Sequence, residues 1–273
     1  MKRKFIQFFN ALLINGYFKG FLSGKIYEGK LKKICVPGLN CYSCPGALGS
    51  CPIGSLQAVL GSYKYKISMY VTGFLIFFGA LMGRFVCGWL CPFGLIQELL
   101  YKIKSVKVKL PKWTTYIKYV ILLVFVILLP LMWTNEFGMG DPTFCKYICP
   151  AGTLEGGIPL LILNKGLRSA VGLLFTWKIS ILILIIIMSI FIFRPFCKVL
   201  CPLGAIYAIF NPISLYRYSV DDHKCTKCGK CSKVCKMDVD IYKKPNSLEC
   251  IRCGECVEEC PTKAIKKGIL KDI

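Results

Sequence analysis

Four apolar runs dominate the pattern of hydrophobic and polar positions along this chain. They cover residues 5–18, 67–83, about 116–133 and 177–193. The last three are near the roughly 17–25 residues that a helix needs to cross a bilayer. The first run is shorter and carries Gln7 and Asn10. The pattern predicts a mainly α-helical, polytopic membrane bundle of about four spans.

Composition agrees with a membrane protein. Hydrophobic residues make up 55% of the chain, against about 45–50% in soluble domains. Trp113, Trp133 and Trp177 fall at the edges of the apolar runs, where interfacial tryptophans are enriched. The stretch 156–175 is apolar but is broken by Pro159 and by two basic residues, Lys165 and Arg168. We therefore interpret that stretch as interfacial or re-entrant.

The charge pattern predicts the sidedness of these spans. The net charge of +22 could attract nucleic acid, but the lysines flank the apolar runs, which indicates membrane anchoring and no nucleic-acid partner. The loop 102–118 holds six lysines and no acid, which places it in the cytoplasm. Counting spans returns the chain after Arg194 to the same side. The loop 22–66 opposes this topology, because it also carries six lysines and only one glutamate.

Cysteines repeat at the ends of the apolar runs. The stretch from Arg84 to Gly94, "RFVCGWLCPFG", recurs from Arg194 to Gly204 as "RPFCKVLCPLG". A third copy of the C-x3-C-P-x-G pattern begins at Cys145. Its C-P-x-G ending appears once more after Cys51, without a cysteine four residues earlier. Two thiols four residues apart can face the same way on a helical turn, which the proline then ends.

Each such pair supplies half of the ligands that a four-thiolate iron–sulfur cluster needs, so two pairs have to meet in space. Three other interpretations stay open. The thiols could be inert and buried, they could bind structural zinc as a Cys₄ set, or those on the outer side could form disulfides.

The C-terminal tail carries the clearest metal signal. From Cys225 and again from Cys250, cysteines follow the spacing C-x2-C-x2-C-x3-C. This is the run of bacterial two-cluster ferredoxins, in which the fourth cysteine of each run ligates the other cluster. The spacing therefore predicts two [4Fe–4S] clusters, one held by Cys225, Cys228, Cys231 and Cys260 and the other by Cys235, Cys250, Cys253 and Cys256.

The predicted organisation is thus a membrane domain over residues 1–215 and an α+β ferredoxin domain over residues 216–273. The spans divide the remaining cysteines between two sides of the membrane. We expect an inner site with one further iron–sulfur cluster, built from Cys87, Cys91, Cys197 and Cys201. An outer-side site would draw on the other six, with Cys41, Cys44, Cys145 and Cys149 as first choice and Cys35 and Cys51 as alternative ligands.

Several other chemistries are disfavoured. A single histidine, His223, and the lack of a C-x-x-C-H motif argue against haem, and we interpret His223 as a loop or capping residue. No nucleotide-binding glycine motif or catalytic triad is evident, so no catalytic residue is assigned. Glu98 and Glu155 follow cluster motifs and could take protons from a quinone. Such acids are more often interface residues or helix-start charges.

The chain resembles the NapH/NosR family of membrane polyferredoxins. The resemblance rests on the basic start with R-x3-Q (Arg3 to Gln7), the C-x3-C-P motifs after apolar runs, and the two-cluster tail. It implies service to periplasmic nitrate or nitrous oxide reductases and a separately encoded partner that could bear flavin. The segment 35–54 and the pair Cys145/Cys149 are additions that the simpler family pattern does not require.

The leading hypothesis is a membrane electron-transfer protein, which we interpret as a subunit of an oxidoreductase system and not as a stand-alone enzyme. It would sit in the cell's inner membrane with its ferredoxin domain in the cytoplasm. Electrons would pass between a cytoplasmic donor or acceptor and an extracytoplasmic redox partner or a quinone. The alternatives are a redox-driven maturation factor for a respiratory metalloenzyme, and a redox sensor, for which no output domain is evident.

Overall fold

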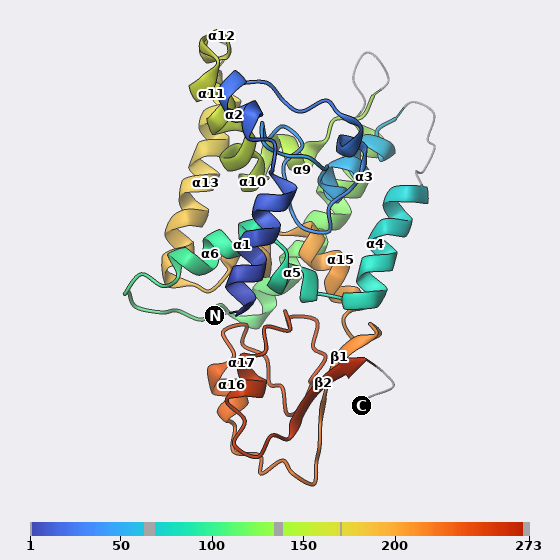
Figure 1. The fold of residues 1–273 in the computed structure, drawn as a ribbon, viewed down its shortest axis with the longest axis vertical. Coiled ribbons are helices and arrows are strands. Elements are labelled where there is room, and N and C mark those ends of the chain that lie inside the picture. The colour runs from blue at the N-terminus through green and yellow to red at the C-terminus, as the bar shows by residue number, and fades with distance from the viewer. Residues whose placement is uncertain (1, 63–68, 134–138, 170, 270–273) are drawn as a thin grey trace.

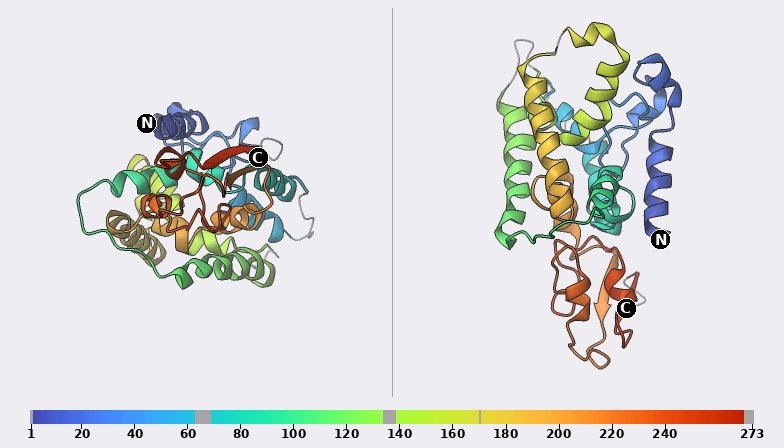
Figure 2. Two further views of the ribbon diagram at one scale, coloured as in Figure 1. Left: turned by 90° about the horizontal axis from the view of Figure 1, so that it is seen from below. Right: turned by 90° about the vertical axis from the view of Figure 1, so that its left-hand side faces the viewer.

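The computed structural model describes residues 2–62, 69–133, 139–169 and 171–269. The first two residues of the second predicted span and the last four of the predicted ferredoxin domain lie outside this description. Over the described residues the protein is mainly helical, with a small α+β region at the C-terminal end (Figure 1). The helical part forms an upright bundle, and the α+β region extends from one end of it (Figure 2).

Two helices in the described part are long and apolar enough to cross a membrane. One is the continuous helix Lys112–Met132 with a mean hydropathy of 2.3, and the other is α13 (Leu173–Phe191) with 2.5. Less than a quarter of either helix is buried inside the protein, at 22% and 17%. Apolar side chains thus cover the outside of this bundle. The first helix is built in succession from η2 (Lys112–Tyr116), α7 (Ile117–Ile121), η3 (Leu122–Leu128) and α8 (Leu129–Met132).

Pro130 explains the irregular winding inside the first long helix. Its ring nitrogen cannot donate to the preceding turn, and the residues before it, in η3, wind as a π-helix. The hydroxyl of Thr143 donates to the carbonyl of Phe125 at 2.6 Å in the same stretch. Neighbouring hydroxyls commonly satisfy the carbonyl groups that a proline frees in apolar helices.

Shorter apolar helices occupy the other predicted runs. The second run forms α4 (Met69–Met82), and the stretch Pro150–Leu163 forms α10 (Pro150–Gly152), η4 (Thr153–Gly157) and α11 (Ile158–Leu163). The first run forms α1 (Lys2–Ile14), whose polar face points inward. Gln7 on that helix is fully buried, whereas Phe5 and Leu13 are 70% and 57% exposed. This arrangement is the reverse of a helix on a water-soluble core.

The four C-P-x-G motifs adopt one local structure. The cysteine of each motif precedes a helix whose first residue is proline, a position where proline's missing N–H costs nothing. These helices are α3 (Pro52–Leu60), α6 (Pro92–Leu100), α10 and α15 (Pro202–Phe210). The first cysteines of the pairs lie in the short helices α5 (Phe85–Trp89), α9 (Thr143–Tyr147) and α14 (Pro195–Val199). The remaining helices of the bundle are α2 (Phe18–Ser23), η1 (Lys30–Lys33) and α12 (Lys165–Arg168).

The α+β region pairs its first and last segments. Strand β1 (Tyr216–Val220) lies antiparallel to β2 (Ile265–Ile269), with Tyr218 opposite Lys267. Between them lie the short helices α16 (Lys230–Val234) and α17 (Glu255–Glu258), which pack against each other.

This region packs tightly against the end of the bundle that carries α5. The indole N–H of Trp89 donates to the carbonyl of Arg252 at 3.0 Å, and the Arg252 guanidinium returns a bond to the carbonyl of Met82 at 2.8 Å. Gly88 lies so close to this surface that a β-carbon there would stand 2.3 Å from the carbonyl oxygen of Ile251. Close backbone approach thus requires glycine at position 88.

We predict that Gly88→Ala loosens this contact. Overpacking of a tight interface costs about 1–3 kcal/mol, so the variant should unfold at lower temperature and lose protection of its C-terminal region from protease. Gly73→Ala on α4 is the matched control, because a β-carbon at position 73 meets no atom within 4 Å. Equal unfolding temperatures for the two variants would contradict the packing argument.

Candidate metal centres

Two cavities in the ferredoxin domain are each lined by four cysteines. One is lined by Cys225, Cys228, Cys231 and Cys260, and the other by Cys235, Cys250, Cys253 and Cys256. The fourth cysteine of each run therefore faces the cavity of the other run, as the spacing predicts. Four thiols around a common space are the donor set that a [4Fe–4S] cluster requires.

The inner set of cysteines also meets in space. The sulfur of Cys91 lies within electrostatic range of those of Cys87 and Cys197, and that of Cys201 within range of the same two. All four thiols are at most 7% exposed. The two halves come from α5–α6 and α14–α15, which lie on the side of the bundle that faces the ferredoxin domain (Figure 1).

Two fully buried arginines join these halves crosswise. Arg84 donates to the carbonyl of Cys197 at 3.1 Å, and Arg194 donates to the carbonyl of Cys87 at 2.6 Å. Each arginine stands three residues before the first cysteine of its own pair and bonds the first cysteine of the opposite pair. The repeated R-x2-C spacing in the sequence, with an arginine before both cysteine pairs, is the signal that could have predicted these two contacts.

Carboxylates balance both arginines. Arg84 pairs with Glu249 at 2.6 Å, and Arg194 pairs with Glu98 at 2.7 Å. Burial opposes charge on Glu249, but Arg84 and Lys118 outweigh it and hold the pKa of that carboxyl below its ordinary value. Glu98 shows the same balance, since burial works against its charge and Arg194 with Arg3 lowers its pKa. Both acids therefore stay ionised at neutral pH, and breaking one buried pair would cost about 3–5 kcal/mol.

The R-x3-Q motif of α1 belongs to the inner site. Arg3 forms a two-pronged ion pair with Glu98 at 2.7 and 2.8 Å and donates to the carbonyl of Gly88. Gln7 donates to the carbonyl of Cys91 at 2.6 Å. The motif thus fixes the backbone of the first cysteine pair.

The outer-side set differs from the sequence-based first choice. Cys145 and Cys149 lie within electrostatic range of Cys41 and Cys51. A β-carbon on Gly54 would lie 3.8 Å from the Cys145 sulfur, which places the Cys51 turn beside that pair. The structure therefore brings together Cys41, Cys51, Cys145 and Cys149, with Cys51 in place of Cys44, the first choice from the sequence.

The two leftover thiols lie nearby. Cys44 contacts the Asn15 amide oxygen, with a sulfur–oxygen distance of 3.6 Å. Cys35 is buried, and its backbone N–H donates to the Tyr70 hydroxyl at 3.0 Å. All cysteines in the structure are free thiols, so no disulfide joins these two.

One short segment connects the inner and outer sets. The backbone N–H of Leu39 lies beside the Cys91 sulfur, and the next N–H, that of Asn40, lies beside the Cys51 sulfur. A β-carbon on Gly38 would stand 3.2 Å from the Cys91 α-carbon, so the segment lies directly against the inner pair. Two adjacent peptide groups thus touch one cysteine of each set.

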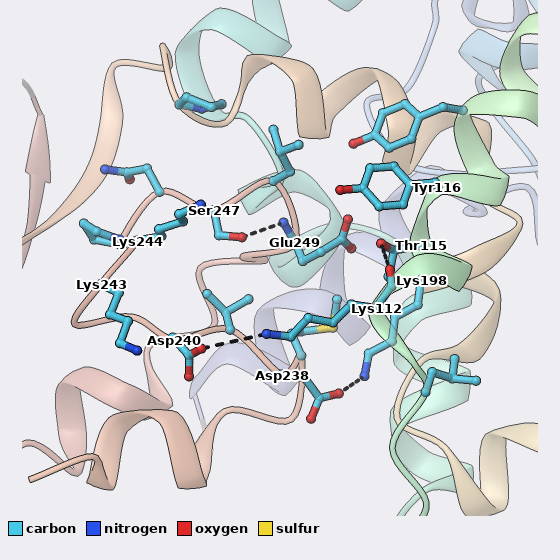
Figure 3. Close-up of a pocket in the computed structure, with 18 residues that line it drawn as sticks. Lys112, Thr115, Tyr116, Lys198, Asp238, Asp240, Lys243, Lys244, Ser247 and Glu249 are labelled. Carbon is cyan, nitrogen blue, oxygen red and sulfur yellow. Dashed lines mark hydrogen bonds and ion pairs between the residues drawn. The ribbon is translucent and has the colours of Figure 1, made fainter.

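A cavity of about 690 Å³ lies where the ferredoxin domain meets the Lys112–Met132 helix (Figure 3). Lys198 pairs with Asp238 at 2.7 Å across this contact, and Lys112 pairs with Asp240 at 3.9 Å. Lys198 directly follows Cys197, and Asp238 lies three residues after Cys235. Ion pairs therefore hold the second ferredoxin set against the inner set.

The acids and the histidine singled out from the sequence have structural partners. Glu98 is ion-paired as described above, and Glu155 accepts the backbone N–H of Cys41 at 2.8 Å. His223 is exposed, and its backbone N–H donates to the Asp221 side chain.

Among the described residues, no three His, Cys, Asp or Glu side chains converge closely enough to hold a single metal ion. A four-iron cluster spaces its thiolates more widely than one ion does. The sets of four thiols fit the cluster by donor type and number.

Comparison with known proteins now defines the class. A family model described as a 4Fe–4S binding domain matches the chain three times, over residues 67–111, 119–162 and 174–215. A model described as a 4Fe–4S dicluster domain matches residues 217–265. Each of the first three matches contains one complete C-x3-C-P motif, and the fourth contains both ferredoxin runs.

Relatives support the same class. An uncharacterized protein of Methanocaldococcus jannaschii is 30% identical over 197 residues, which cover 68% of this chain and 72% of that protein. The methylamine utilization ferredoxin-type protein MauN of Methylorubrum extorquens is 23% identical over 187 residues (67% and 59%). Regulatory protein NosR of Pseudomonas aeruginosa is 28% identical over 171 residues (58% and 21%).

This chain belongs to the family of 4Fe–4S-binding polyferredoxins with a C-terminal dicluster domain. The resemblance to NosR that the sequence suggested is confirmed at the level of the family. No solved structure matches the chain.

We predict that Cys51→Ser removes about four iron atoms per chain, the content of one cubane, whereas Cys44→Ser keeps them. The two variants make the same chemical change within one segment, so each is the control for the other. Iron per chain, measured on anaerobically purified protein, decides between them. Loss of iron from Cys44→Ser, and not from Cys51→Ser, would instead support the ligand set that was first choice from the sequence, with Cys44 in it.

Proposed function

We propose that this protein relays electrons across a membrane through four [4Fe–4S] clusters arranged along its long axis. The order runs from the Cys225 set to the Cys250 set, then to the inner set and the outer set. Electrons pass between a cytoplasmic redox partner at the ferredoxin domain and an extracytoplasmic partner or quinone at the other end.

Contact between successive sites is the observation that carries this proposal. Gly88, between the two cysteines of the first inner pair, touches the backbone of Ile251, next to Cys250. The peptide groups of Leu39 and Asn40 then lie beside one inner and one outer cysteine, and Gly38 lies directly against the Cys91 backbone. A hydrocarbon core of about 30 Å is too thick for one fast electron step, and the intermediate inner site divides that distance.

We infer four spans from the exposed faces of the helices. Besides the two long helices, α1 and α4 turn large apolar side chains outward. Phe9 on α1 is 54% exposed, and Met69 and Phe77 on α4 are 81% and 58% exposed. Such faces are stable against lipid and costly against water.

Charge supports a cytoplasmic ferredoxin domain. The lysine-rich loop 102–118 lies at the ferredoxin end, where Lys109 approaches Asp238 to 3.5 Å and Lys112 pairs with Asp240. Arg3 at the start of α1 lies 3.7 Å from Glu255 at the same end. These basic segments share one side of the bundle, and basic loops favour the cytoplasm.

The first test is the content of iron and acid-labile sulfide in full-length protein, purified without oxygen in detergent. Four cubanes require about 16 of each per chain. About 8 of each would mean that only the ferredoxin sets are filled, and the proposed path through the membrane domain would then be wrong.

Transmembrane transfer can be measured in liposomes that enclose a membrane-impermeant oxidant dye. A membrane-impermeant reductant added outside should bleach the dye through the intact protein. Cys91→Ala breaks the inner set and should slow bleaching to the rate of protein-free liposomes. Bleaching at the intact rate in this variant would rule out a path through the inner site.

A further inference from the structure

A polar side chain stands at the same place after the cysteine of each C-P-x-G motif. Six residues after the cysteine, the sequences "CPIGSLQ", "CPFGLIQ", "CPAGTLE" and "CPLGAIY" end on Gln57, Gln97, Glu155 and Tyr207. Gln57 and Tyr207 are fully buried, and Gln97 is 1% exposed. Buried polar groups are costly unless they bond a partner, so the recurrence calls for a common role.

Two of the four side chains reach another repeat, and the other two contact the segment before Cys51. Gln97 donates from Nε2 to the Cys197 sulfur at 3.2 Å, and Gln57 donates from Nε2 to the Cys145 sulfur at 4.0 Å. Tyr207 donates to the carbonyl of Pro37 at 2.9 Å. Glu155 accepts the backbone N–H of Cys41. The glutamines thus donate to thiols, whereas Tyr207 and Glu155 bond the segment that joins the inner and outer sites.

The two glutamines differ in how far they are tied to other groups. Gln97 also accepts the backbone N–H of Phe196 through Oε1 at 3.1 Å, which aims its amide at the sulfur. Within the described part of the chain, Oε1 of Gln57 is buried without a hydrogen-bond partner. A role in backbone support alone does not account for Gln57, because the amide N–H of its side chain donates to a sulfur atom.

We propose that Gln97 and Gln57 are positioning residues that set the reduction potentials of the two membrane-domain clusters, Gln97 that of the inner cluster and Gln57 that of the outer cluster. This inference rests on the proposed function. An N–H group directed at a ligand sulfur stabilises the more negative, reduced cluster and raises its potential.

The distances rank the two effects. The donor at 3.2 Å should act more strongly than the donor at 4.0 Å, which is at the limit of an N–H···S contact. Removal of Gln97 should therefore lower the inner potential more than removal of Gln57 lowers the outer potential.

The experiment is a redox titration of each cluster by electron paramagnetic resonance on the full-length protein in detergent. Signals are assigned by their loss in Cys201→Ala, for the inner site, and in Cys149→Ala, for the outer site. Gln97→Leu should lower the equilibrium constant for reduction of the inner cluster at least tenfold, which corresponds to a potential lower by 59 mV for one electron. The potential of the outer cluster should stay unchanged. Gln57→Leu should shift only the outer cluster, and by less.

Gln7→Leu is the matched control. Gln7 is a fully buried glutamine beside the same inner site, but it donates to the carbonyl of Cys91 and not to a sulfur. Its replacement should move the inner potential much less than Gln97→Leu. Gln97→Met keeps the length and the neutral charge of the side chain and removes the donor, so it gives the same reading if Gln97→Leu fails to fold.

Three results would overturn the inference. They are an unchanged inner potential in both Gln97 variants, a shift of both clusters by one glutamine, or an equal effect of Gln7→Leu. Iron content separates this inference from the proposed function. About 16 iron atoms per chain with unshifted potentials reject the role of the glutamines alone, whereas about 8 in the unmodified protein reject the membrane path itself.

Discussion

A C-x3-C-P turn presents two thiols on one face of a helix and then ends, so it can build only half of a four-thiolate site. The pairing of distant segments in the membrane domain follows from this constraint. Turns far apart in the sequence have to meet, and the repeats meet alternately, so that the Cys87 turn faces the Cys197 turn. Arg84 and Arg194 then lock that pairing by bonding the backbone of the opposite turn.

Bringing thiols and guanidinium groups into an apolar bundle requires partners for every charge. Glu98 and Glu249 supply them, and Arg3 and Lys118 complete the two ionic clusters. Each cluster draws on a distant part of the chain, one from α1 and one from the ferredoxin domain. The same contacts that neutralise the inner site therefore hold α1 and the ferredoxin domain in place.

The sequence predicted the features that depend on spacing alone. The crossed ferredoxin sets and the inner set meet in space because their spacings repeat. The sequence left the outer set open between Cys44 and Cys51, because Ala47 stands where the first cysteine of a pair would precede Cys51, and Cys41 approaches from a loop instead. Loop paths of this kind follow from tertiary packing, which no local pattern encodes. The C-P-x-G motif at Cys51 was the available signal, since the cysteines of the other C-P-x-G motifs all join a set.

The pairing of Arg84 with Glu249 also bears on how the protein is made. These residues are 165 positions apart, and the arginine is fully buried while its acid belongs to the last structural unit of the chain. During synthesis the first half of the inner site emerges long before the carboxylate that balances it. The Arg84–Glu249 pair therefore cannot form until the tail is translated and docks. Completion of this ionic cluster is thus a late event, and a chain stopped short of the tail would keep Arg84 without the carboxylate that balances it.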